Sequence, residues 1–327
     1  MNILFCINKD IFSNIAINYL SEIFKSHKCY ITLSHGVGKP SPALEALSFI
    51  EKTLPYEILF PLYKNLPTNN LQESLARIDE LIESTDLDKL SDINRLTKNT
   101  QAAPTKIEEL VEDKNPDKFS DAGRLTKKRF LDFDNFITKY SIRSLTIDNI
   151  NNDESRETLK SLNLDLIISI RYGQIFKDDT LTIPKYGILN LHSGKLPQYR
   201  GIMATFWSML NHEETLGTTL HYIDDNNIDT GKIIKISYIN FNKTQSLFWH
   251  LDQLYIKGCK TIIKAAKEIE NGTPPKAKTP ENMGNYYSVP QAKDISLFKE
   301  YGYSLYKNSD ITMLLKKFHP DTETLLA

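Results

Sequence analysis

Two polar side chains stand two residues apart in the run GILNLH, which covers residues 187–192. Asn190 and His192 alternate there with Leu189 and Leu191. Successive side chains of a strand point to opposite faces, so the pattern places the amide and the imidazole on one face and the leucines on the other. Open parallel sheets bind ligands at the carboxyl ends of their strands. The pair is therefore a candidate for chemistry at such a strand end.

An amide, an imidazole and a carboxylate together suit the transfer of an acyl group to an amine. This reaction passes through a tetrahedral intermediate that bears an oxyanion. An Asn amide can donate to that oxygen, and the loss of one comparable donor typically costs about 2.7–4 kcal/mol. A His side chain ionises near neutral pH, so it can donate to the same oxygen or move a proton. A nearby carboxylate favours the protonated imidazole and can accept the proton of the amine. The downstream run IDDNNIDTG, residues 223–231, supplies carboxylates.

Other chemistries lack their usual sequence patterns. The chain has no GxSxG turn, no HExxH motif and no Cys/His spacing typical of a metal site. Its first strand-to-helix turn reads NKDIFSN, without the GxGxxG that holds a dinucleotide, and no P-loop follows. These patterns disfavour a nicotinamide or flavin dehydrogenase and a metalloenzyme, so no metal is expected.

An Asn–His pair on a strand is, by itself, more often a hydrogen-bonded structural pair than a catalytic one. The wider set of motifs is more specific. The runs N-L-H-S-G-x-L-P-x-Y-R-G, T-L-H-Y-I-D-D and I-D-T-G-x-I begin at residues 190, 219 and 228. Together they resemble the folate-dependent formyltransferase family over roughly Leu164–Ile234. The resemblance implies a Rossmann-like fold, N10-formyltetrahydrofolate as the donor, and Asn190, His192 and Asp229 as the catalytic residues.

The resemblance also implies two segments that hold the folate. The first is part of SIRYGQIF, and the second is the loop that leads to Asp229. The implied residues are Tyr172, Gly173, Gln174, Ile175, Asp224, Asp225 and Asn226. For the first segment, a strand-end turn that needs Gly173 for its backbone explains the pattern equally well.

Two further residues have open roles. His221 either assists catalysis or satisfies a buried polar contact, and the second interpretation is favoured. Arg200 either meets a substrate phosphate or fixes its loop through a carboxylate.

The elements that must position these residues follow an α/β pattern. Apolar runs at Ile3–Ile7, Tyr30–Ser34, Asp165–Ile170 and Tyr186–Leu191 predict strands, and Phe12–Phe24 predicts an amphipathic helix. Short Ile-rich runs are typical of strands covered on both faces. The sequence therefore predicts an α/β fold, with a mostly parallel twisted sheet and helices on both faces.

A charged helical insertion is predicted at about residues 71–139. It contains a duplication, because Arg77–Lys98 returns as Lys106–Lys127 with twelve of 22 positions identical. Two copies are too few for a solenoid. A solvent-exposed excursion is the favoured interpretation, and a lid or a dimer contact is the alternative.

The predicted domains are a Rossmann-like catalytic domain at 1–240 and a C-terminal part at 241–327. The second contains a long helix, Phe248–Glu270, and a small cap. This tail does not resemble the C-terminal barrel with which tRNA formyltransferases hold RNA.

The composition of the chain limits the kinds of partner that are expected. Lys and Arg number 40 against 41 Asp and Glu, so the basic surplus typical of large nucleic-acid complexes is missing. Three cysteines without metal spacing, no leader pattern and no long apolar run predict a soluble cytoplasmic protein that binds no membrane. A homodimer is expected by analogy.

The acceptor that fits best is a small primary amine, with a nucleotide-linked amino-deoxysugar as the leading candidate. The alternatives are methionyl-tRNA formylation, folate binding without catalysis, and hydrolysis of the formyl donor.

Overall fold

The computed structural model describes residues 1–35, 45–61 and 129–318. The chain divides into two compact units: residues 1–55 with 131–311, and residues 56–130 with 312–327. The predicted duplication at Arg77–Lys127 lies outside the described residues, as does most of the predicted insertion. The candidate site lies within the first unit.

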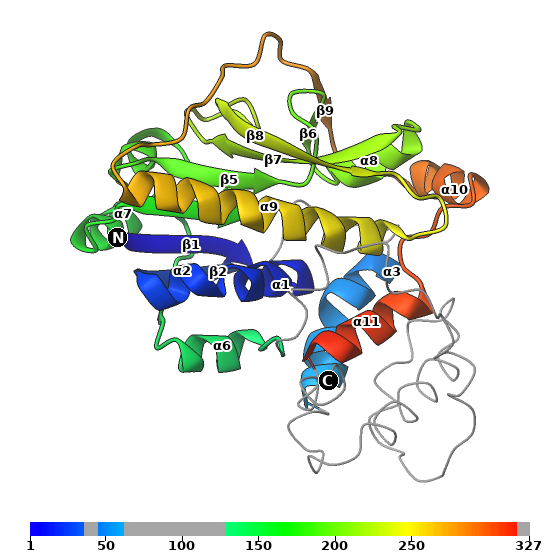
Figure 1. Cartoon of the computed structure of the whole chain (residues 1–327), viewed down its shortest axis with the longest axis horizontal. Coiled ribbons are helices and arrows are strands. Elements are labelled where there is room, and N and C mark those ends of the chain that lie inside the picture. The colour runs from blue at the N-terminus through cyan, green and yellow to red at the C-terminus, as the bar shows by residue number, and fades with distance from the viewer. Residues whose placement is uncertain (36–44, 62–128, 319–327) are drawn as a thin grey trace. The chain divides into compact units, whose positions relative to one another are not determined.

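The first unit is built on a seven-stranded sheet in the order β3-β2-β1-β4-β5-β7-β8 (Figure 1). Neighbouring strands from β3 to β5 are parallel, and β7 is antiparallel to both β5 and β8. The predicted mostly parallel sheet is thus confirmed. The strands are β1 (Asn2–Asn8), β2 (Lys28–Ser34), β3 (Arg143–Leu145), β4 (Leu166–Ile170), β5 (Ile188–His192), β7 (Thr215–Tyr222) and β8 (Ile233–Asn240).

The helices follow the predicted pattern with one break. The predicted helix Phe12–Phe24 is two helices that meet at Leu20, the cap residue of both. The helices are α1 (Ile11–Tyr19), α2 (Ser21–Ser26), α3 (Glu45–Ser48), the π-helix η2 (Phe49–Leu59), α6 (Phe133–Lys139), α7 (Asp153–Ser161), the 3-10 helix η5 (Asp178–Thr182), α8 (Ala204–Leu210), α9 (Leu247–Glu270), α10 (Ala292–Glu300) and α11 (Asn308–Phe318).

Helices cover both faces of the sheet, which explains the uninterrupted apolar strands. On one face, Phe5 of β1 stacks on Phe24 of α2 with ring centroids 4.3 Å apart. On the other face, Leu4 and Cys6 join a buried cluster that includes Leu159 of α7. Alternate residues of β1 therefore enter two separate apolar cores.

The long helix α9 packs against β7 and β8 and lies beside α1 (Figure 1). Its Gly258 faces Leu191 of β5, where an added Cβ would stand 2.7 Å from Leu191 Cδ1. That distance is shorter than real Cβ contacts. The helix thus packs against the side of β5 opposite to Asn190 and His192, and the predicted division at residue 240 falls within the first unit.

A small second sheet lies beside the end of β5. It pairs β6 (Tyr199–Gly201) in parallel with β9 (Asn285–Tyr287). Gly284, at φ +55°, passes so close to the Pro197 carbonyl that a Cβ there would overlap it. The predicted cap is thereby joined to the loop that follows His192.

A buried ion cluster connects the carboxyl ends of β1 and β4 to η2. Arg171, whose φ is +54°, donates from Nε to Asp10 Oδ2 at 2.8 Å and from Nη2 to Glu51 Oε2 at 2.7 Å. Asp10 also caps α1 by accepting from the Ser13 backbone N–H at 2.9 Å. Burial raises the pKa of Glu51 to about 7, although Arg171 opposes that shift. The turn after β4 is therefore fixed by charge as well as by packing.

In the second unit, the described residues form a small aromatic contact. Phe318 packs on Phe60 and Phe130, with ring centroids 5.1 and 5.7 Å apart. The Phe130 backbone N–H donates to the Lys317 carbonyl at 2.7 Å. This contact brings together segments that are far apart in the sequence.

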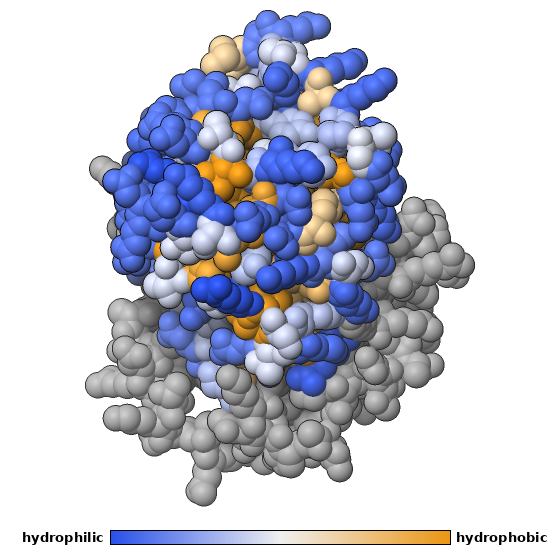
Figure 2. Space-filling view, turned by 90° about the vertical axis from the view of Figure 1, so that its left-hand side faces the viewer, coloured by the Kyte–Doolittle hydropathy of each residue, from blue (hydrophilic) through white to orange (hydrophobic). Residues whose placement is uncertain are grey.

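The face shown in Figure 2 is mostly hydrophilic, with apolar residues in small groups between polar ones. Such a mixture is ordinary for a surface in contact with water. Within the described ranges, every helix is too short or too polar to cross a bilayer.

Candidate active site

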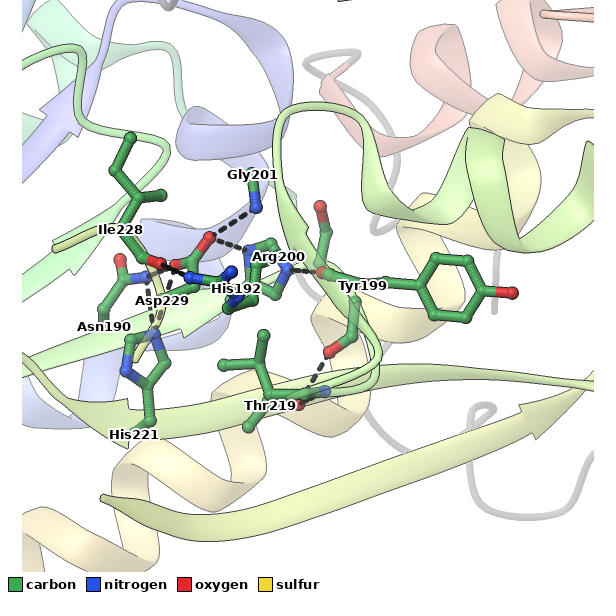
Figure 3. A network of polar contacts seen from close by, with 12 residues as sticks. Asn190, His192, Tyr199, Arg200, Gly201, Thr219, His221, Ile228 and Asp229 are labelled. Atoms are coloured by element: carbon green, nitrogen blue, oxygen red, sulfur yellow. Dashed lines mark hydrogen bonds and ion pairs between the residues drawn. The ribbon is translucent and has the colours of Figure 1, made fainter. Parts of the chain in front are cut away.

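The three predicted catalytic side chains meet at one point. Asn190 and His192 lie at the end of β5, and Asp229 comes from the connection between β7 and β8. His192 Nδ1 lies 3.4 Å from Asp229 Oδ2, and Asn190 Nδ2 lies 3.5 Å from Asp229 Oδ1 (Figure 3). An amide, an imidazole and a carboxylate thus converge at the carboxyl edge of β5.

Asp229 is held as an anion. It has a φ of +56°, and the Gly201 backbone N–H donates to its Oδ2 at 2.9 Å. Burial alone raises the pKa of this carboxyl, but His192, His221 and the Gly201 N–H outweigh burial and lower the pKa to about 2. A carboxylate with so low a pKa is a weak proton acceptor. It is better suited to stabilising a protonated imidazole.

His192 has an acceptor beside each ring nitrogen. Its Nε2 lies 2.6 Å from the Tyr199 carbonyl, and because a carbonyl only accepts, Nε2 carries the proton there. Nδ1 faces Asp229 Oδ2 at 3.4 Å, so the carboxylate stabilises a proton on Nδ1. A Cβ at Gly194 would stand 2.6 Å from Nε2, so the loop after β5 needs glycine at this position.

His221 lies behind the amide of Asn190. Its Nδ1 lies 2.8 Å from the Tyr222 carbonyl, and its Nε2 lies 3.0 Å from Asn190 Nδ2 and 3.4 Å from Asp229 Oδ1. The ring is 1% exposed. Of the two interpretations of His221, the structure supports the buried polar contact, in which this ring orients the Asn190 amide.

Sequence reasoning did not identify three groups that complete the site. They are the Tyr199 carbonyl on His192, the Gly201 N–H on Asp229, and Thr219, whose hydroxyl donates to the Gly194 carbonyl at 2.6 Å. The first two are backbone groups of β6, which any residue could supply. Thr219 faces His192 across the β5–β7 ladder and could have been identified from that register.

Most groups of the first predicted folate segment contact neighbouring residues of the protein. Tyr172 is buried and packs on Phe176, with ring centroids 5.6 Å apart. Gln174 accepts from the Ile150 N–H at 2.7 Å, and the Gly173 N–H donates to Ser34 Oγ at 2.9 Å. Ile175 is 44% exposed. Of the four, Ile175 presents the most side-chain surface to a ligand, and the left-handed residue of the turn is Arg171 rather than Gly173.

The second predicted folate segment is a polar loop that holds itself in shape. Asp224 accepts from the Lys232 N–H at 2.9 Å, and Asp225 accepts from Asn227 N–H at 2.8 Å. Asn226 exchanges two hydrogen bonds of 3.0 Å with Asp178. These contacts place the loop that ends at Asp229, whereas a ligand contact by these three side chains stays a prediction.

Arg200 lies over the connection that carries Asp229 (Figure 3). Its Nη1 donates to the Ile228 carbonyl at 3.3 Å. In the described part of the chain it forms no ion pair, so the loop is fixed through a carbonyl rather than the predicted carboxylate. The residues that the structure describes contain no group of three His, Cys, Asp or Glu side chains that could hold a metal ion.

Comparison with known proteins matches the part of the chain that holds this site. Residues 88–248 match the family model described as Formyl transferase. The methionyl-tRNA formyltransferase of Halothermothrix orenii is 31% identical over 148 residues, which is 45% of this chain and 46% of that protein. The enzyme of the same name from Clostridioides difficile is 34% identical over 120 residues, which is 37% of this chain and 38% of that protein. The chain spans less than half the length of these relatives.

Two solved structures show a weaker likeness. A 4-N formyltransferase from Francisella tularensis is 25% identical with a TM-score of 0.40, over 47% of this chain and 59% of that chain. A sugar N-formyltransferase from a Shewanella species is 12% identical with a TM-score of 0.47, over 91% and 87%. Both TM-scores are below 0.5, and no conclusion rests on them. From the family model and the curated relatives, we conclude that residues 88–248 of this chain carry a formyl transferase domain.

Proposed function

We propose that the protein transfers a formyl group from N10-formyltetrahydrofolate to a primary amine. One observation carries the proposal: the Asn190 and His192 side chains both approach the Asp229 carboxylate, at 3.5 and 3.4 Å, at the end of β5. The family match supports formyl chemistry at this point.

In this proposal each of the three side chains has a role that its position supports. The amine nitrogen attacks the formyl carbon, and the carbonyl electron pair moves to the oxygen. Asn190 Nδ2 carries a second N–H, engaged only by the 3.5 Å contact to Asp229, which can turn to the oxyanion. His192 Nδ1 takes the proton of the attacking amine, and Asp229 stabilises the resulting imidazolium.

Collapse of the intermediate completes the transfer. The bond between the formyl carbon and N10 breaks, its electron pair stays on N10, and His192 returns the proton there. The formyl group remains on the amine and tetrahydrofolate leaves. No covalent enzyme intermediate is needed, which agrees with the lack of a nucleophile motif in the sequence.

The proposed acceptor is a nucleotide-linked amino-deoxysugar. A net charge of −1 and a tail without basic enrichment support a small acceptor over a large nucleic acid. Methionyl-tRNA is the second candidate, because the curated relatives carry that name. Those matches leave more than half of each relative uncompared.

A donor-dependent assay tests the function. The full chain is incubated with N10-formyltetrahydrofolate and a panel of amino-sugar nucleotides, with charged initiator tRNA as comparator, and products are identified by mass gain. Formylation of an amino sugar is expected. Formylation of the tRNA alone would identify methionyl-tRNA as the acceptor. Release of formate without any acceptor would indicate hydrolysis of the donor. Donor binding with neither product would indicate a folate-binding protein.

A further inference from the structure

The small sheet of β6 and β9 has two unlike faces. On one face, Tyr287 stacks between Tyr199 and Trp207, with ring centroids 5.3 and 5.2 Å away. Asn211 Nδ2 donates to the hydroxyls of Tyr199 and Tyr287 at 3.3 and 3.1 Å. This face is filled by the protein's own side chains and points away from Asp229 (Figure 3).

The other face lies on the side of the site. Arg200 and Tyr286 are register partners, and side chains alternate along a strand, so both leave the sheet opposite to the Tyr199–Tyr287 stack. Arg200 reaches the Ile228 carbonyl next to Asp229. The Tyr286 ring therefore shares a face with the residue that positions the Asp229 loop.

The Tyr286 ring lies directly against Gly201. A Cβ on Gly201 would stand 2.9 Å from Tyr286 Cε2, and the Gly201 N–H binds Asp229 Oδ2 at 2.9 Å. Only a glycine permits this approach at φ +96°. The ring is thereby held one residue away from the carboxylate of the site.

Tyr286 is nevertheless 50% exposed, whereas its neighbour Tyr287 is packed. Exposure of a large ring is unremarkable at a random surface position. Here the ring is fixed beside a converging polar trio, and ligand sites are commonly lined by aromatic side chains next to a few polar groups. An open ring face at this place is suited to a ligand.

We propose that Tyr286 stacks on the amine-bearing ring of the acceptor and so determines acceptor specificity. The inference rests on the proposed function. The ring lies against Gly201, whose N–H binds Asp229, so its place favours the amino sugar over the nucleobase, which a diphosphate and a ribose separate from the amine. What reaches Tyr286 is the apolar C–H face of the sugar, which a deoxysugar presents without hydroxyl groups.

Steady-state kinetics of the full chain test the inference. Tyr286→Ala and Tyr286→Leu should raise the KM for the amino-sugar nucleotide by about threefold to tenfold, the range expected for loss of one aromatic contact. The KM for N10-formyltetrahydrofolate should not change. Tyr286→Phe should behave as the wild type, because stacking needs the ring and not the hydroxyl.

Tyr238→Ala is the matched control, since Tyr238 is 43% exposed on β8. It should leave both KM values unchanged. The Leu variant retains bulk at the site, so a folding defect confined to Tyr286→Ala leaves the test intact.

The outcomes separate the two proposals. Transfer by the wild type with unaltered acceptor KM in the Leu variant would overturn the stacking contact alone, as would a rise in donor KM instead. A wild type that transfers to no amine would overturn the proposed function and this inference with it.

Discussion

Asp229 illustrates how a residue acquires its role from its neighbours. Four groups approach its two oxygens: the Gly201 N–H, the Asn190 amide and the rings of His192 and His221. They keep the side chain charged at any pH at which the protein would be assayed, since its pKa is about 2. In the proposed mechanism the carboxylate therefore acts by stabilising a proton on His192.

Removing that charge should stop turnover without removing the donor site. Asp229→Asn keeps the size of the side chain and an oxygen for the Gly201 N–H, but it no longer stabilises an imidazolium. We expect folate binding, measured by fluorescence titration, to stay within about twofold, and kcat to fall at least about a hundredfold. Unchanged turnover would assign proton transfer to another group.

Removing the amide or the imidazole should abolish transfer in a folded protein. Asn190→Ala deletes an oxyanion donor, so a loss of about 10²–10³ in kcat is expected. His192→Ala also deletes the proton carrier and should be at least as damaging. Circular dichroism and the unfolding midpoint serve as controls. Activity close to wild type in either variant contradicts the mechanism.

The sequence predicted which three side chains would converge better than it predicted their surroundings. Alternation in GILNLH placed Asn190 and His192 on one face, and the motif resemblance added Asp229. The Tyr199 carbonyl and the Gly201 N–H could not be predicted, because backbone donors and acceptors are the same in every residue. Their position depends on the pairing of β6 with β9, strands about 86 residues apart (285 − 199).

At the scale of elements, the turn after β4 depends on a contact that sequence did not reveal. Glu51 and Arg171 are 120 residues apart, and neither belongs to a local motif. Arg171 adopts a left-handed backbone that glycine would accept more readily, and its charge is stabilised by Asp10 and Glu51. Strands and helices were predictable from local apolar patterns, whereas this ion cluster exists only in the folded sheet.

Glu51 should make stability depend on pH. Its pKa is about 7 in the folded protein and ordinarily 4.5, so the folded state binds more protons between these values and stability falls as pH rises through them. Glu51→Gln removes the titration and can still accept from Arg171. Relative to that of the variant, the free energy of unfolding of the wild type should therefore fall by on the order of 1–3 kcal/mol between pH 5 and pH 8.

Urea unfolding at the two pH values measures this shift. The comparison uses the difference between the proteins, so titrations common to both cancel. A difference that does not change with pH would mean that Glu51 ionises normally.

At the scale of the whole molecule, the duplicated segment remains to be connected to function. The family match begins at residue 88 and includes the second copy, Lys106–Lys127. The trio and the strands that carry it belong to other parts of the chain. Deletion of Lys106–Lys127 should therefore leave folate binding intact, as measured by titration of the purified variant. Loss of binding would make the segment part of the site.

The predicted domain boundary at residue 240 separates elements that pack together in the structure. A boundary at residue 240 followed from the change in pattern after β8. In the structure α9 packs along α1 and β7, so residues on both sides of that boundary form one unit. Periodicity describes a helix but does not state which partner its apolar face will find.

Gly258 sets the alignment of the reactive pair from behind the sheet. The helix α9 approaches β5 so closely that a single methyl group has no room between Gly258 and Leu191. Leu191 separates Asn190 from His192 along the chain, so any displacement of its side chain is transmitted to both. The position of the two side chains thus depends partly on a glycine that lies on the opposite side of β5.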